Sequence, residues 1–324
     1  MLIQTSIVYA VLSGIGTWLM NQLKNSRLVA CFLAQKDTTA TVEGSIFYKI
    51  YHVVRQTLCG LFSALGFTRL FEGSIFKITY FWCFLPVVLA PFLPTMVVLA
   101  LTAAGFGSLL LNLLCDKNKK LKHFAINKYI IIYAAIYLFA TFTSVSPRGS
   151  LLGGLLTAFF LLFYFVVINS VTTRKQLDVL VFFFVMAGVF VSLYGFYQFM
   201  FPAKFSGVWH DTDMFTSIAF RVYSTLGNPN VLGEYFLLVI PIGFAYVLIS
   251  KKLISKLIYL AACGVMMLCL ILTYSRGCYV GILAAIGLFL VLLDRRFILL
   301  AVLGLLALPF VLPETIIDLS LIHI

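Results

Sequence analysis

Apolar runs of about 20 residues recur along this chain from about Ile78 onward, and each is long enough to cross the ~30 Å hydrocarbon core of a bilayer as a helix. The composition agrees, because 62% of the 324 residues are hydrophobic, 10% are charged, and the mean hydropathy is +1.08. The sequence therefore predicts an all-α, polytopic integral membrane protein. We expect about nine spans, at 78–91, 93–114, 129–145, 150–171, 178–201, 229–250, 257–274, 277–293 and 297–312.

The first of these spans is interrupted by proline. Pro86, Pro91 and Pro94 fall within or just after it, and proline removes a backbone donor and breaks a regular helix. Segment 78–114 is therefore predicted to be either a broken pair of helices or a re-entrant turn.

The two ends of the chain differ from this membrane domain, which we place at residues 78–318. Residues 1–77 mix apolar and polar positions, a pattern that favours amphipathic helices lying along the cytoplasmic interface. The last six residues, 319–324, read LSLIHI. They match the translation of a transposase adapter end used in sequencing libraries, so we expect an assembly artefact there and a natural protein that continues beyond Asp318.

The net charge of +12 does not indicate nucleic-acid binding, because the basic residues are scattered through short loops beside apolar runs, as expected for contact with membrane lipid. Retained positive charge marks the cytoplasmic side of a membrane protein. One set of alternate loops carries twelve cations and is predicted to be cytoplasmic: Lys117, Lys119, Lys120, Lys122, Lys128, Arg174, Lys175, Lys251, Lys252, Lys256, Arg295 and Arg296. The opposite set carries only Arg148, Lys204, Arg221 and Arg276.

Three of these four outward cations share a local context. Arg148 lies in SVSPRGS, Arg221 in RVYSTLGNPN and Arg276 in TYSRG, each at or just before a helix predicted to run inward. The amino terminus of a helix carries partial positive charge and unpaired N–H groups, so an arginine there favours a bound anion. The alternative is simple contact with lipid headgroups, which is the favoured interpretation for Arg148.

Polar residues surround the other two arginines. Asn228 is predicted to cap a helix that starts at Pro229, and Ser275 to cap a later one. Glu234 follows Asn230 by four residues, so the two share a helix face, and the acid is expected to pair with an outward arginine or to contact a sugar hydroxyl. A separate group in the loop 202–220, His210 with Asp211 and Asp213, is too weak a pattern to predict a metal site.

The segment RVYSTLGNPNVLGEY, followed about 45 residues later by TYSRGCYVGILAAIGLFLVLL, resembles the O-antigen ligase and polymerase family of bacterial envelope glycosyltransferases. The resemblance covers about residues 120–310. It implies a GT-C-like enzyme of the bacterial plasma membrane that needs no metal or other cofactor. Such an enzyme transfers a glycan from an undecaprenyl-diphosphate carrier to a glycan or lipid acceptor at the outer face.

On this resemblance, Arg221 and Arg276 hold the lipid diphosphate as catalytic residues. The substrate-binding residues would be Asn228, Asn230, Tyr274, Ser275, Arg148 and Glu234. The family also uses a histidine in a large outward loop after the ninth span as the general base, and we expect that residue beyond the end of this chain.

Two other function classes compete with glycan transfer. A transporter or flippase for an anionic or lipid-linked solute would carry polar groups near the middle of its spans and often an inverted repeat, and the sequence offers few of the former and no convincing repeat. A membrane scaffold without enzymatic activity would tolerate replacement of the outward arginines.

Overall fold

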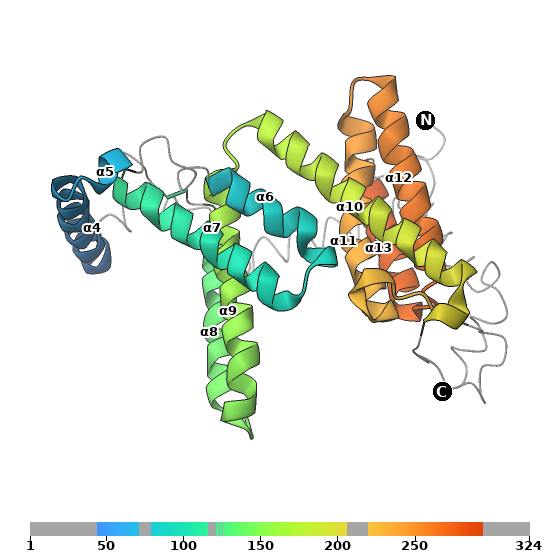
Figure 1. Ribbon diagram of the computed structural model, residues 1–324, viewed down its shortest axis with the longest axis horizontal. Helices are drawn as coiled ribbons and strands as arrows, with labels where there is room; N and C mark the ends of the chain where they lie inside the picture. The colour runs from blue at the N-terminus through green and yellow to red at the C-terminus, as the bar shows by residue number, and fades with distance from the viewer. Residues whose placement is uncertain are drawn as a thin grey trace, which may run out of the picture. The chain divides into compact units, whose positions relative to one another are not determined.

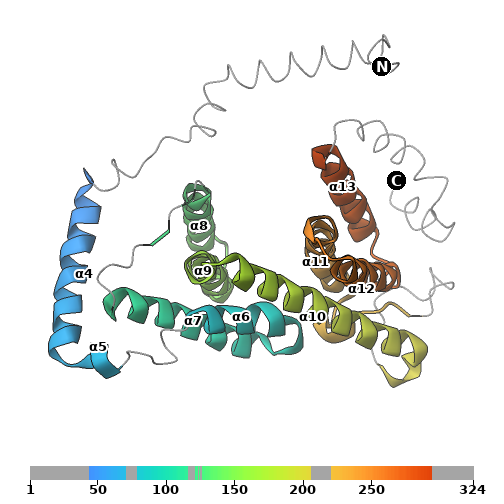
Figure 2. The same cartoon turned by 90° about the horizontal axis from the view of Figure 1, so that it is seen from above.

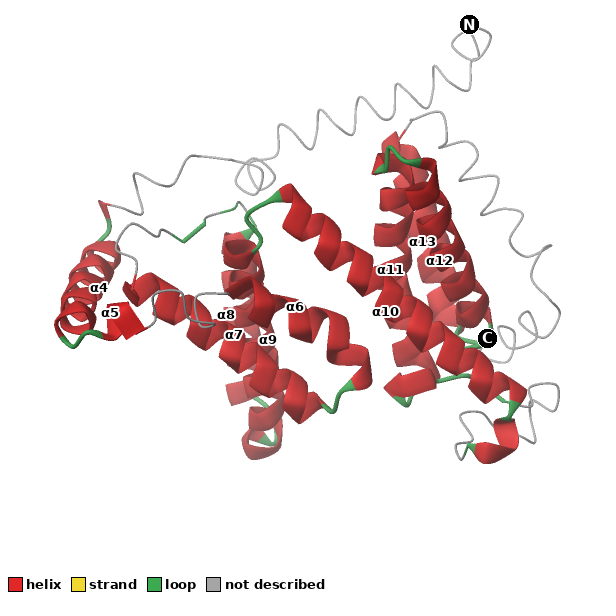
Figure 3. Ribbon diagram, turned by 45° about the horizontal axis from the view of Figure 1, so that its top comes forward, coloured by secondary structure: helices red, strands yellow, loops and turns green. Residues whose placement is uncertain are grey.

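The computed structural model describes residues 44–70, 79–115, 121–122, 124, 126–205 and 220–293, and all regular secondary structure in these ranges is helical (Figures 1 and 3). The chain divides into two compact units. The first takes in the described segments up to Leu70 and from Leu114 to Ala135. The second takes in the described residues between Phe71 and Leu113 and those from Ile136 onward.

The first unit contains α4 (Ile46–Ala64) and the short α5 (Phe67–Leu70). Ser45 caps α4 by accepting a hydrogen bond from the Tyr48 amide at 3.1 Å. Apolar side chains at helical spacing, among them Ile46, Ile50 and Leu61, are exposed along one side of α4. The helix is not among those apolar enough to cross a membrane. It has the amphipathic pattern that predicts a helix at a membrane interface.

The second unit begins with α6 (Thr79–Leu89), the 3-10 turn η2 (Ala90–Phe92) and α7 (Thr95–Cys115). Pro86 lies inside α6 and Pro91 inside η2, so the predicted break in this segment is confirmed. At 1.5 Å per residue, α6 rises only about 16 Å. That is about half of a bilayer core. Asn112 of α7 donates a hydrogen bond to Thr79, which ties the two helices together.

Six further α-helices follow, and five helices of the described chain are long and apolar enough to span a bilayer, namely α7, α9, α10, α11 and α12. The protein is therefore a membrane protein. Eight of the predicted spans coincide with helices, and the ninth, 297–312, lies outside the described residues. The bounds are α8 (Asn127–Phe142), α9 (Pro147–Ser170), α10 (Arg174–Met200), η3 (Pro202–Lys204), η4 (Ser224–Leu226), α11 (Pro229–Ile249), α12 (Leu253–Ile271) and α13 (Arg276–Leu293).

The core of the second unit is formed where α10, α11, α12 and α13 pack together (Figures 1 and 2). Small residues allow the close approach that helix packing in a membrane requires. A Cβ placed at Gly195 of α10 would lie 2.6 Å from the Cys269 sulfur of α12, and one placed at Gly233 of α11 would lie 2.9 Å from the Cys278 Cβ of α13. These glycines therefore set the distances between the helices that carry the candidate site.

Candidate functional site

Two segments that are far apart in the sequence meet at one end of the α10–α13 group. The Val222 amide donates to the Leu272 carbonyl at 3.1 Å, which joins the segment before η4 to the turn after α12. Phe220 and Val222 are buried beside this bond. The contact brings together the residues that we name the arginine cluster: Arg221, Asn228, Asn230, Tyr274, Ser275 and Arg276.

Arg221 is held by contacts from both segments. Its Nε donates to the Thr273 carbonyl at 2.9 Å, and its Nη2 donates to Asn230 Oδ1 at 3.1 Å. The side chain is half-buried. Because a backbone carbonyl and an amide oxygen both fix the guanidinium, its orientation is set before any ligand arrives.

The second arginine lies close enough to affect the first electrostatically. Burial lowers the pKa of Arg221 below its ordinary value, and the positive charge of Arg276 lowers it further, while Tyr279 and Cys278 act in the opposite direction. Arg276 is the first residue of α13, and within the described residues its guanidinium makes no protein hydrogen bond. The fold therefore holds two like charges near one another, an arrangement that a bound anion would stabilise.

The helix starts beside the arginines follow the predicted pattern in part. Asn228 caps α11, since its Oδ1 accepts from the Asn230 amide at 2.8 Å, and Pro229 takes the first helical position, so this prediction is confirmed. Ser275 lies directly before α13, but its hydroxyl donates to the Cys278 sulfur at 3.2 Å. Cys278 in turn lies against the first turn of α11, where the Asn230 carbonyl is 3.8 Å from its sulfur.

Both segments of the cluster contain a residue with an unusual backbone conformation. Ser224, with φ of 51°, and Tyr274, with φ of 49°, are the two non-glycine residues at positive φ in the described part of the chain. Such conformations cost about 1–3 kcal/mol each and persist only where surrounding contacts impose them. Thr273 supplies one such contact, because its buried hydroxyl accepts from the Ser275 amide at 3.2 Å and donates to the Leu270 carbonyl at 2.7 Å.

Gln198 imposes the unusual backbone conformation of Ser224. The sequence did not lead us to expect a role for this residue. It lies near the end of α10, is 1% exposed, and its Oε1 accepts from the Ser224 amide at 2.7 Å while its Nε2 donates to the Ser224 carbonyl at 3.3 Å. The Ser224 hydroxyl also donates to the Val191 carbonyl at 2.6 Å. An amide side chain inside an otherwise apolar run was the signal in the sequence, since a buried polar group needs partners.

Two residues predicted for the site stand apart from these contacts. Arg148 is exposed in the first turn of α9, a helix that packs against α6. Glu234 is exposed on α11 and forms no ion pair within the described residues, although it follows Asn230 on the same helix. Arg148 therefore does not join the arginine cluster in the described part of the chain, and the Glu234 carboxylate is exposed near the start of α11.

His210, Asp211 and Asp213, which form too weak a pattern to predict a metal site, lie outside the described residues. In the described part of the chain, no group of three or more metal-binding side chains is found. No protein-family model, curated protein or solved structure matches this chain.

Proposed function

We propose that this chain is a membrane glycosyltransferase of the O-antigen ligase and polymerase type, with a GT-C-like fold. It would transfer or polymerise a glycan from an undecaprenyl-diphosphate carrier. The observation that carries the proposal is that Arg221 donates to Asn230, in the first turn of α11, and to the Thr273 carbonyl, in the turn that leads to Arg276 at the start of α13. Two guanidinium groups beside two helix amino termini are suited to a diphosphate, because arginine binds phosphate oxygens through paired N–H donors.

The reaction assigns each group a defined role. The acceptor hydroxyl oxygen forms a bond to the anomeric carbon of the donor sugar, and the bond from that carbon to the diphosphate oxygen breaks. The lipid diphosphate leaves with the electron pair, and the hydroxyl proton passes to a general base. Arg221 and Arg276 stabilise the negative charge that develops on the leaving group, without a metal ion. Removing one such donor from an active site typically lowers the rate about 10²–10³-fold.

The remaining polar residues of the cluster would position the arginines and the substrate. Asn230 and the Thr273 carbonyl direct the Arg221 side chain, and Asn228 fixes the start of α11. Tyr274 and Ser275 present the turn that leads into Arg276. Glu234 lies one turn further along α11, where its exposed carboxylate can accept from a sugar hydroxyl.

The proposed location is the outer face of a bacterial plasma membrane. Five apolar helices support a membrane protein. The excess of Lys and Arg in the alternate loops supports an arrangement in which the arginine cluster faces outward. A polyprenyl carrier keeps its phosphates at the membrane surface, which is the level at which helices of spanning length begin.

The test measures glycan transfer by the complete purified protein, reconstituted with a lipid-linked glycan donor and an acceptor. We expect Arg221→Ala and Arg276→Ala each to lower product yield about 10²–10³-fold. Arg→Lys at either position should also fail, because lysine lacks the bidentate fork. The matched control is Lys204→Ala, which removes a cation that contacts the Tyr197 hydroxyl at 3.2 Å and lies outside the cluster.

Product of wild-type length and yield from both alanine variants would overturn the proposal. Uptake of a labelled anion by proteoliposomes, with no glycan product, would support the transporter alternative instead. Binding of a polyprenyl diphosphate to the same variants separates binding from catalysis, and we expect the arginine substitutions to lower both the affinity and the rate.

A further inference from the structure

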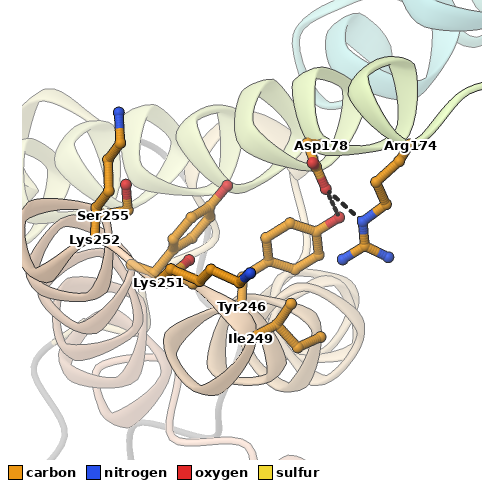
Figure 4. Close-up of a pocket in the computed structure, with 9 residues that line it drawn as sticks. Arg174, Asp178, Tyr246, Ile249, Lys251, Lys252 and Ser255 are labelled. Carbon is orange, nitrogen blue, oxygen red and sulfur yellow. Dashed lines mark hydrogen bonds and ion pairs between the residues drawn. The ribbon is translucent and has the colours of Figure 1, made fainter.

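A cavity of about 480 Å³, lined mainly by polar and charged residues, lies between α10, α11 and α12 (Figure 4). Its lining includes Arg174 at the start of α10, Tyr246 near the end of α11, and Lys251 and Lys252 in the α11–α12 connection. These helix ends are opposite to the ends that carry Gln198 and the arginine cluster. The cavity therefore lies at the opposite end of the same helices from the arginine cluster.

The one carboxylate that lines the cavity is already satisfied. Asp178 forms an ion pair with Arg174 at 3.1 Å between Oδ1 and Nε, and the Tyr246 hydroxyl donates to the same oxygen at 2.9 Å. The Arg174 guanidinium also lies 5.8 Å from the centre of the Tyr246 ring. These contacts fix one wall of the cavity, as Figure 4 shows.

The rest of the lining carries unbalanced positive charge. Lys251 and Lys252 add two cations to the Arg174–Asp178 pair, so the three cations and one carboxylate give the lining a formal charge of +2. Figure 4 shows Lys251 beside Tyr246, and Lys252 near Ser255, whose hydroxyl can donate a further hydrogen bond. The cavity volume falls within the range of roughly 300–1,000 Å³ that is typical of small-molecule sites.

We propose that this cavity binds the phosphate headgroup of an anionic phospholipid. The shared chemistry is that of a phosphate ester, and the surroundings favour a lipid over a soluble phosphate. Ile249, Leu253 and Ile254 are each more than half exposed around the α11–α12 connection, where they would contact acyl chains. Basic cavities between spanning helices are established headgroup sites at the cytoplasmic face, which is the face predicted for this loop.

The test uses the purified complete protein in a neutral detergent, with dihexanoyl phosphatidylglycerol as the probe and dihexanoyl phosphatidylcholine as the neutral lipid. We expect the anionic lipid to bind, and the Lys251→Gln/Lys252→Gln double variant to weaken that binding about tenfold or more. The matched control is Lys175→Gln/Lys256→Gln. It removes the same charge from the same face, at residues that do not line the cavity, and should bind as the wild type does.

A variant with the opposite expected sign keeps the proposal falsifiable if the lysine variant folds poorly. Asp178→Asn removes the carboxylate but keeps an oxygen for the Tyr246 hydroxyl, so binding of the anionic lipid should tighten severalfold. Equal weakening by both lysine variants, or no effect of Asp178→Asn, would overturn the cavity as the site. Equal binding of inorganic phosphate would overturn the lipid as its ligand.

Discussion

Replacing Gln198 with leucine tests whether the conformation of the arginine cluster is imposed from α10. In the wild type the Gln198 amide satisfies both the N–H and the C=O of Ser224, and both residues are at most 3% exposed. Leucine has a similar volume but offers no partner, so two buried backbone groups would be left unpaired. At about 1–3 kcal/mol for each group, the cost for the two groups is about 2–6 kcal/mol.

Local opening of the segment around Ser224 would return its unpaired N–H and C=O groups to solvent. Such opening costs less free energy than global unfolding. Ser224 adopts a conformation with φ of 51° that itself costs about 1–3 kcal/mol. Without Gln198 the segment would relax, and Arg221 would lose its alignment with Thr273 and Asn230. A local destabilisation of about 2 kcal/mol corresponds to about 30-fold faster amide exchange in this segment.

Hydrogen exchange of peptides covering residues 220–228, measured by mass spectrometry in detergent, reads this effect directly. The Val222 and Ser224 amides should exchange faster in Gln198→Leu, and glycan transfer should fall with them. The control is Ser192→Ala on the same helix, because that buried hydroxyl donates at 2.8 Å to the Gly188 carbonyl of its own helix. Unchanged exchange at 220–228 in Gln198→Leu would refute the reasoning.

Two further predictions concern the starts of α11 and α13. Gly233→Ala places a Cβ 2.9 Å from the Cys278 Cβ, so α13 must shift and carry Arg276 with it. We expect the stability to fall by about 1–3 kcal/mol and the binding of a polyprenyl diphosphate to weaken. Thermal unfolding and affinity equal to those of the wild type would contradict this prediction. Asn228→Ala removes the cap of α11 and should cost about 0.5–2 kcal/mol in thermal unfolding. Asn228→Ser keeps a capping oxygen and should behave as the wild type does, and equal loss in both variants would argue against the cap.

The predicted helices and the observed ones differ mainly at their starts, and the differences have local causes. The span predicted at 178–201 begins at Arg174, because Thr173 and Gln176 form a capping box that starts the helix among charged residues. A hydropathy window excludes such residues, so it begins too late. The start of α11 was predictable, since Asn228 and Pro229 are local signals whose effect does not depend on the rest of the fold.

The candidate site was only partly predictable, because similar local patterns have different fates in three dimensions. Arg148 and Arg276 both begin apolar helices, yet α9 packs against α6 while α13 packs against α11. Nothing in the few residues around each arginine distinguishes the two cases. Gln198 was missed for the same reason, since its partner lies 26 residues further along the chain.

The sequence by itself determined that the chain forms apolar helices, approximately which residues they span, and which loops carry cations. These properties depend on side-chain hydropathy and on contacts within one helical turn. Only the tertiary structure decided which polar residues share a site. Helix packing brings Val222 to Leu272, Arg221 to Thr273 and Gln198 to Ser224. Such long-range contacts depend on how whole helices fit together, with glycine at Gly195 and Gly233 allowing the close approach.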